Sequence, residues 1–137
     1  MTTPTKPVAE MPLVAEARVR VVMTKIFVTG VKLQAEIGVH PHERGRAQPL
    51  VVDVELDVPA AGLKRLRDTV NYETIVQAAR DVAAQGHIAL VETFAEQLAR
   101  LCLADERVTR ARVRVEKPLA LAPDAAGAGV EVTLVRG

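Results

Sequence analysis

Two histidines, a proline and a glutamate stand together at residues 40–43, within the stretch IGVHPHERGRAQPLVVDVEL. Imidazole and carboxylate groups at this spacing could bind a metal ion, place a catalytic carboxylate on a loop, or form a polar turn. A zinc site needs a third or fourth ligand, and the only other histidine and cysteine are His87 and Cys102. Cys102 falls in an apolar helical pattern, so we expect no metal site here. Glu43 remains either a catalytic carboxylate or a solvated loop residue.

Lys117 breaks the pattern of the residues before it. Alternation over residues 111–117 puts it on the same face of a predicted strand as Ala111, Val113 and Val115, directly before Pro118. A lysine at the end of an apolar face either extends to solvent along its own stem or is placed for proton transfer. Both interpretations stay open on the pattern alone.

Tyr72 and Glu92 lie at the starts of two predicted helices. Tyr72 is the only tyrosine of the chain, and it could equally pack on a sheet as an ordinary aromatic residue. A carboxylate such as Glu92 is favoured in a first helical turn by the helix dipole, with no functional need. Arg44 and Arg46 are interpreted as surface charge.

The composition indicates one globular domain and excludes some functions. The chain has 137 residues, 49% of them hydrophobic, with a formal net charge of +1 and 2% aromatic residues. A balanced charge and so few aromatic rings argue against nucleic-acid binding and against an anionic membrane surface. No apolar run is long enough to span a bilayer.

Residues 1–22 differ in character from the rest of the chain. They contain three prolines and weak periodicity, and they lack the basic start and apolar stretch of a secretory signal. We expect an N-terminal extension, either flexible or the result of a misassigned start codon, followed by one domain over residues 23–137. A cytoplasmic location is expected.

Hydrophobic periodicity predicts six elements in this domain. Strands are expected over residues 25–32, 50–58, 111–116 and 130–135, and residues 59–69 form an irregular connector. Asn71 can cap a helix that runs to about residue 85. A second helix begins near residue 90, with an apolar stripe of Val91, Phe94, Ala95, Leu98, Leu101 and Cys102. The order ββααββ predicts an α+β fold, with two helices on one face of a four-stranded antiparallel sheet. Its two open edges favour pairing with other copies.

Five motifs in one order resemble the dihydroneopterin aldolase family over about residues 25–136. The stretch at residues 37–56 is followed by DTVNYETI, LVETFAEQLA, VRVEKP and GVEV. The resemblance implies a tunnelling fold (T-fold), whose subunits join strand to strand. A tetrameric ring or an octamer of two rings would result, with active sites between subunits. It also implies metal-independent and cofactor-free retro-aldol cleavage of 7,8-dihydroneopterin in folate biosynthesis, with some 2'-epimerisation.

The resemblance assigns a role to each of the unusual residues. Glu92 corresponds to the glutamate that binds the 2-amino and N3 positions of the pterin, together with backbone groups near Val91. Lys117 corresponds to the catalytic lysine, and Glu43 to the loop glutamate beside the reacting side chain of the substrate. Tyr72 corresponds to a tyrosine that reaches in from the neighbouring subunit.

Some features depart from the family pattern or fit a relative. The sequence PLALAPDAAGAG after Lys117 lacks the usual proline-rich I-P-x segment, so the pocket wall there is undefined. Asn71 and Tyr72 also resemble dihydroneopterin triphosphate 2'-epimerase, which shares the fold. A zinc-dependent pyruvoyl-tetrahydropterin synthase would use a His-x-His pair like His40 and His42, but no matching cysteine–histidine set is present. A non-catalytic pterin-binding or structural ring is the alternative of another class.

Overall fold

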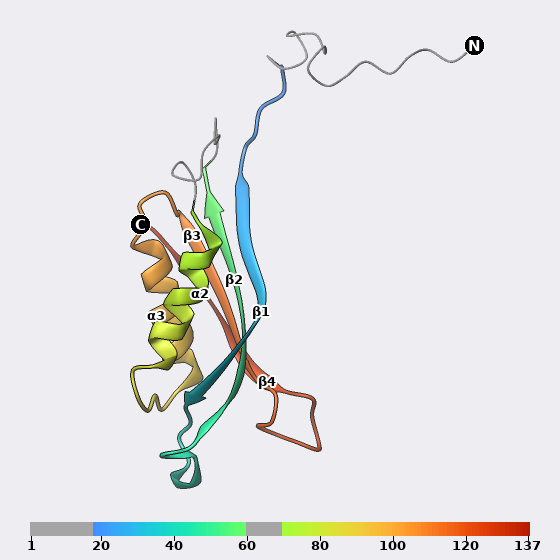
Figure 1. The fold of residues 1–137 in the computed structure, drawn as a ribbon. Coiled ribbons are helices and arrows are strands. Elements are labelled where there is room, and N and C mark those ends of the chain that lie inside the picture. The colour runs from blue at the N-terminus through green and yellow to red at the C-terminus, as the bar shows by residue number, and fades with distance from the viewer. Residues whose placement is uncertain (1–17, 60–69) are drawn as a thin grey trace, which may run out of the picture.

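One antiparallel sheet, with strands in the order β1-β2-β3-β4, forms the body of the molecule (Figure 1). The computed structural model describes residues 18–59 and 70–137. The strands are β1 (Thr24–Glu36), β2 (Ala47–Val58), β3 (Arg110–Lys117) and β4 (Ala128–Val135), and the helices are α2 (Tyr72–Ala83) and α3 (Val91–Leu103). Both helices cover the same face of the sheet, α2 against β1 and α3 against β3 and β4. The expected α+β class and the order ββααββ are confirmed.

Alternating side chains of the central strands build the core. In β2 the residues Leu50, Val52, Val54, Leu56 and Val58 are buried, while the residues between them are half-buried on the other face. In β3 Ala111, Val113 and Val115 are buried in the same way, and the residues between them are half-buried or exposed. The period of two follows from the strand geometry. Phe94 and Leu98 of α3, both fully buried, close this layer from the helical side.

β1 is longer than the sequence pattern predicted, because a β-bulge hides its alternation. Val28 pairs with Val54 and Val31 pairs with Val52, so Thr29 and Gly30 together stand opposite the single residue Asp53, and the ladder contains one extra residue. Gly30 has φ +69°, a conformation that favours glycine, and its N–H donates to Asp53 Oδ1 at 2.6 Å. The inward positions change from even to odd numbers at this point, which breaks the period on which a sequence prediction depends.

Other boundaries also differ from the prediction. β2 begins at Ala47 rather than at residue 50, and α2 ends at Ala83 rather than near residue 85. Leu101 was predicted in the apolar stripe of α3 but is 46% exposed, because the buried stripe runs through Leu98, Ala99 and Cys102 instead.

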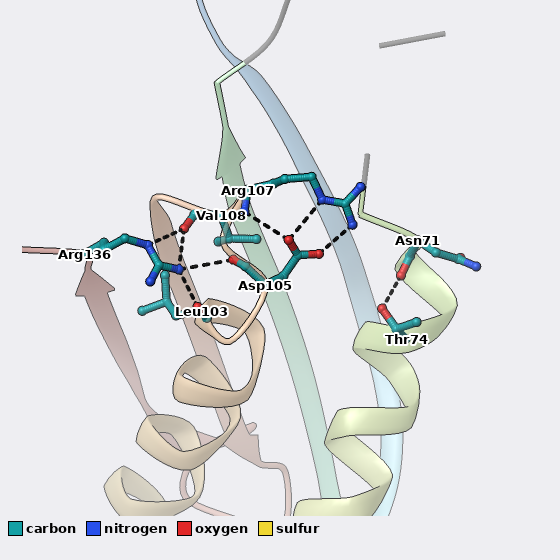
Figure 2. Close-up of polar contacts among 7 residues, drawn as sticks. All are labelled: Asn71, Thr74, Leu103, Asp105, Arg107, Val108 and Arg136. Atoms are coloured by element: carbon teal, nitrogen blue, oxygen red, sulfur yellow. Dashed lines mark hydrogen bonds and ion pairs between the residues drawn. The ribbon is translucent and has the colours of Figure 1, made fainter. Parts of the chain in front are cut away.

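Side-chain caps close the helices at the end of the domain drawn in Figure 2. Asn71 Oδ1 accepts from the N–H of Glu73 at 2.9 Å, and Thr74 Oγ1 donates to the Asn71 carbonyl. The Arg136 guanidinium, just after β4, donates to the carbonyl oxygens of Leu103, Asp105 and Val108. The bond to Leu103 satisfies a carbonyl group that α3 leaves unpaired at its C-terminus, and the other two bonds go to the turn that follows α3.

Two of the predicted segments lie wholly or partly outside the described residues. The connector at residues 59–69 is described only at Pro59, and the N-terminal extension only from residue 18 onward. Residues 18–22 are exposed, and β1 begins at Thr24, one residue after the predicted start of the domain. Neither described helix has the length and apolar character needed to cross a bilayer.

Candidate active site

A three-residue 3-10 helix, η2 (Pro41–Glu43), presents the Glu43 side chain to the domain. Proline suits its first position, where no N–H is needed. The N–H of Glu43 donates to the carbonyl of His40 at 2.9 Å, and the N–H of His40 donates to Glu43 Oε1 at 3.3 Å. No residue of η2 is buried as a whole, yet the side chain of Glu43 is only 11% exposed. Polar contacts therefore hold this carboxylate in place.

Gly38 provides the surface against which the Glu43 carboxylate rests. A Cβ atom at Gly38 would lie 2.1–2.3 Å from the carboxylate atoms of Glu43, and the φ of Gly38 is +136°. Only glycine adopts this conformation without strain. The missing side chain makes the space that the carboxylate occupies.

Gln48, at the start of β2, binds the same carboxylate. Its Nε2 atom donates to Glu43 Oε2 at 2.9 Å and to the Ile37 carbonyl at 2.7 Å. Because Ile37 is fully buried, Gln48 links the exposed loop to a fixed part of the sheet.

Lys117 completes the arrangement from β3. Its Nζ atom donates to Glu43 Oε2 at 2.7 Å, and its side chain is 13% exposed. The lysine continues the buried face of β3, as the alternation predicted, and at the end of that face it meets a carboxylate rather than extending to solvent. A charge-assisted hydrogen bond of this length is stronger than a neutral one.

The electrostatics of the pair favour an ionised glutamate. The hydrogen bond from Lys117 lowers the pKa of Glu43 from 4.5 to about 2, against the opposing effect of burial, and hydrogen bonds from Gln48 and His40 add to the lowering. Glu43 is therefore a carboxylate at neutral pH, ready to accept hydrogen bonds.

A pocket of about 260 Å³ opens beside the pair. It is lined by His42, Glu43, Arg46, Ala47, Gln48, Pro49, Leu119 and Ala120. One side of it comes from η2 and the start of β2, and Leu119 and Ala120 come soon after Lys117 along the chain. The segment after Lys117, whose role the sequence left undefined, thus forms part of the pocket wall.

Glu92 and Val91 lie at the same end of the domain as Glu43. The loop before α3 is bonded to the end of β1, since the N–H of Gly38 donates to the Ile88 carbonyl at 3.0 Å and His87 Nε2 lies 2.8 Å from the Gly38 carbonyl. Glu92 is exposed in the first turn of α3, and Val91 is half-buried. The Glu92 carboxylate is therefore free to meet a ligand or a neighbouring subunit.

Tyr72 lies at the opposite end of the domain. Tyr72 is the first residue of α2, and α2 starts at the same end of the domain as α3 ends, as Figures 1 and 2 show. Tyr72 is 62% exposed. The length of α2, about 18 Å for its 12 residues, separates it from the loop that contacts Gly38. Within one chain the fold brings together Glu43 and Lys117, with Glu92 at the same end, but not Tyr72.

The paired histidines of the loop contact each other. The rings of His40 and His42 stack with centroids 5.4 Å apart and planes within 6°. Over residues 18–59 and 70–137, no group of three or more His, Cys, Asp or Glu side chains could hold a metal ion.

Sequence reasoning missed two contributors to the site, Gly38 and Gln48. Gly38 received no role from the sequence, and only its contact with Glu43 gives it one. Gln48 lies in the stretch at residues 37–56 that carries part of the family resemblance, but no role for it emerged from that stretch. The distance in space between a glutamine amide and a loop carboxylate is not encoded in periodicity.

Several known proteins with similar sequences are dihydroneopterin aldolases, and one is a related epimerase. A family model described as FolB: Dihydroneopterin aldolase matches residues 26–133. A dihydroneopterin aldolase from Streptomyces coelicolor is 35% identical over 99 residues, which cover 70% of this chain and 83% of that protein. A dihydroneopterin triphosphate 2'-epimerase from Pseudomonas aeruginosa is 28% identical over 102 residues, covering 72% of this chain and 83% of that protein.

Solved structures of dihydroneopterin aldolases have the same fold as this chain. A Burkholderia dihydroneopterin aldolase bound to guanine has a TM-score of 0.72 at 30% identity, covering 84% of this chain and 93% of that one. The Escherichia coli dihydroneopterin aldolase in complex with neopterin has a TM-score of 0.72 at 29% identity, covering 83% of this chain and 99% of that one.

Proposed function

The chain belongs to the dihydroneopterin aldolase family, and we propose that it is a carbon–carbon lyase acting on 7,8-dihydroneopterin. The products are 6-hydroxymethyl-7,8-dihydropterin and glycolaldehyde, in a step of folate biosynthesis. The observation that carries the proposal is the ion pair of Lys117 with Glu43, a residue that lines a pocket. These two residues are the ones to which the family resemblance assigns the reacting side chain and the proton transfer.

The reaction breaks the bond between the first two carbons of the substrate's side chain. A base removes the proton of the second hydroxyl group, the bond breaks as glycolaldehyde forms, and the electron pair moves into the C6=N5 imine of the pterin. Because the substrate itself stores this pair, neither a Schiff base nor a metal is required. A proton then adds to the first carbon and gives the hydroxymethyl product.

Lys117 acts in these proton transfers, through a water molecule, rather than as a covalent nucleophile. Glu43, held ionised by Lys117 and Gln48, orients the hydroxyl groups and that water. The ion pair thus places a proton donor directly against the acceptor that lines the pocket.

Glu92 binds the pterin ring by the edge that carries N3 and the 2-amino group. A carboxylate accepts two parallel N–H bonds from such an edge, and backbone groups near Val91 complete the contact. Guanine and neopterin, the ligands of two related aldolases, both present this edge. The exposure of Glu92 in the isolated subunit is consistent with this role.

Tyr72 completes the site from a neighbouring subunit of a tetrameric ring or of an octamer of two rings. Its position at the far end of its own subunit is consistent with this assignment, as are the two edge strands, β1 and β4, which are open to pairing within the described sheet. Tyr72 would relay the proton that converts the enol intermediate to product. We place this enzyme in the cytoplasm.

A second candidate is dihydroneopterin triphosphate 2'-epimerase, favoured by the similarity to the Pseudomonas aeruginosa enzyme of that name. An epimerase breaks the same bond and re-forms it with the other face presented, so the same residues serve both reactions. The non-catalytic alternative, a pterin-binding ring, would keep the pocket and lack turnover.

An HPLC time course of the purified protein with 7,8-dihydroneopterin, with and without EDTA, tests the proposal. We expect 6-hydroxymethyl-7,8-dihydropterin at the same rate in both, and a smaller monapterin peak from epimerisation. Absence of the hydroxymethyl product from folded protein would overturn the aldolase assignment. The triphosphate substrate, supplied next, would separate the epimerase from the non-catalytic ring.

A further inference from the structure

We infer that Gln48 is a positioning residue, which keeps the Glu43 carboxylate in place while Lys117 changes its protonation state. The inference rests on the proposed function for the role of Lys117. It adds a residue to which no role had been assigned.

The contacts of Gln48 form a tether between the loop and the core. One amide nitrogen donates both to Glu43 Oε2 at 2.9 Å and to the Ile37 carbonyl at 2.7 Å. Ile37 is fully buried and pairs with Ile88 in a bridge to the loop before α3. The carboxylate is therefore connected to a rigid part of the domain through a single neutral side chain.

A neutral tether matters because the other donor is the one that reacts. When Lys117 gives up a proton, its charge disappears and with it the attraction that holds Glu43. The other two residues of η2, Pro41 and His42, are exposed, so packing alone does not hold the loop. The Gln48 amide keeps its donor whatever the protonation state of Lys117, so the carboxylate stays in position between proton transfers.

The same contacts leave one oxygen of Glu43 available. Oε2 already accepts from both Lys117 and Gln48, whereas from the described residues Oε1 accepts only the long 3.3 Å bond of the His40 N–H. A carboxylate oxygen has two lone pairs. Oε1 is therefore the atom that meets the substrate hydroxyl or the water.

Several charged or titratable groups surround this carboxylate. Lys117 approaches from β3, His42 and Arg46 line the same pocket, and His40 belongs to the loop itself. His87 reaches the Gly38 carbonyl from the loop before α3. Loss of the Gln48 donor leaves all of these in place, so its effect on the pKa of Glu43 can be measured separately.

Gln48→Met tests the inference, because methionine keeps the length of the side chain and removes both donor bonds. Gln77→Met is the matched control, since Gln77 Nε2 also donates to a carboxylate, Asp81 Oδ1, at 2.9 Å on the exposed face of α2. Both full-length proteins are compared with wild type in steady-state kinetics with 7,8-dihydroneopterin. The Glu43 carboxyl signal is titrated by carbon-13 NMR and assigned by its absence from Glu43→Gln.

For Gln48→Met we expect kcat to fall about tenfold, the effect of one lost charge-assisted hydrogen bond, with KM changed less than about threefold. The pKa of Glu43 should rise above its wild-type value of about 2. Gln77→Met should change neither quantity. An unchanged kcat, a loss carried by KM alone, or an unchanged Glu43 pKa overturns the inference.

A substitute variant and a readout that does not depend on turnover allow the inference to be tested in every case. If Gln48→Met does not fold, Gln48→Asn replaces it, because its amide is one methylene too short to bridge both acceptors. If wild-type protein does not cleave dihydroneopterin, the proposed function fails by itself. The NMR titration then still decides whether Gln48 holds the carboxylate.

Discussion

The Nζ atom of Lys117 lies 2.7 Å from the Oε2 atom of Glu43, although 74 positions separate the two residues in the chain. Lys117 is the last residue on the buried face of β3, and Glu43 belongs to the short helix η2 in the loop between β1 and β2. Their nearly buried side chains place a cation and an anion where solvent screens them little. The fold thus fixes the position of both partners before any substrate binds.

Lys117→Ala is expected to lower kcat by about two to four orders of magnitude, the range for a lost proton-transfer group, while the Kd for the pterin product changes little. Turnover is followed by HPLC and binding by fluorescence titration. Lys25→Ala is the control, because Lys25 also pairs with a carboxylate, Asp57, at 3.1 Å, but on the open face of the sheet. A Lys117 variant with normal turnover would contradict the mechanism.

Glu92→Ala is expected to weaken pterin binding more than it lowers kcat. It removes a carboxylate that accepts two N–H bonds from the pterin, so Kd should rise roughly ten- to a hundredfold, with a smaller effect on kcat. Glu73→Ala matches it, since Glu73 is also an exposed acidic residue in the first turn of a helix. The two Kd values are compared by titration with the product. Equal affinities in both variants would remove Glu92 from the pterin site.

Gly38→Ala should lower both stability and activity, because its Cβ would collide with the Glu43 carboxylate. We expect a loss of about 1–3 kcal/mol in the free energy of unfolding and a fall in kcat. Gly45→Ala is the control in the same loop, since Gly45 also has a positive φ, +72°, but nothing lies within 4 Å of its added Cβ. Its kcat should stay near wild type. Urea denaturation and the HPLC assay measure the two quantities, and equal kcat values in both variants would exclude the contact as a functional one.

The sequence predicted the fold where one period persists along an element. β2 and β3 alternate without interruption, so their buried residues and the inward side of Lys117 could be read directly from the pattern. The buried residues of β1 could not be read in this way. The bulge at Thr29 and Gly30 changes which alternate residues face the core in the middle of the strand. A backbone irregularity of this kind has no signature in hydrophobicity.

The sequence predicted which residues belong to the site, but it did not predict how they contact one another. Glu43 and Lys117 were both selected, but their contact depends on how the loop folds over the end of β3, which local patterns do not contain. The Gln48 amide and the space above Gly38 become visible only once that loop is in place. Tyr72 remains a prediction, because its proposed contacts belong to another subunit.

The Glu43 ion pair should make stability depend on acidic pH. Glu43 has a pKa of about 2 in the folded protein and an ordinary value of 4.5. Its ionised form therefore contributes full stability above about pH 4.5, and this contribution is lost as the pH falls toward 2. The free energy of unfolding of wild type minus that of Glu43→Gln should shrink over this range. Asp105, whose pKa is also lowered, by its hydrogen bond to Arg107, affects both proteins equally. A difference that stays constant with pH would contradict the ion pair.

Mixing two inactive variants tests whether Tyr72 acts across a subunit interface. Tyr72→Phe and Lys117→Ala are each expected to form little hydroxymethyl product alone. If each site takes Tyr72 from one subunit and Lys117 from the next, co-refolded random mixtures contain intact sites at about a quarter of the interfaces of the closed ring. Activity should then return to about a quarter of wild type. If both residues served the same subunit, every site in the mixture would lack one of them, and activity would not return. Analytical ultracentrifugation of each variant and of the mixture checks that assembly is unchanged. Mixing Tyr72→Phe with the double variant Tyr72→Phe/Lys117→Ala is the control, because no combination of these chains restores the tyrosine.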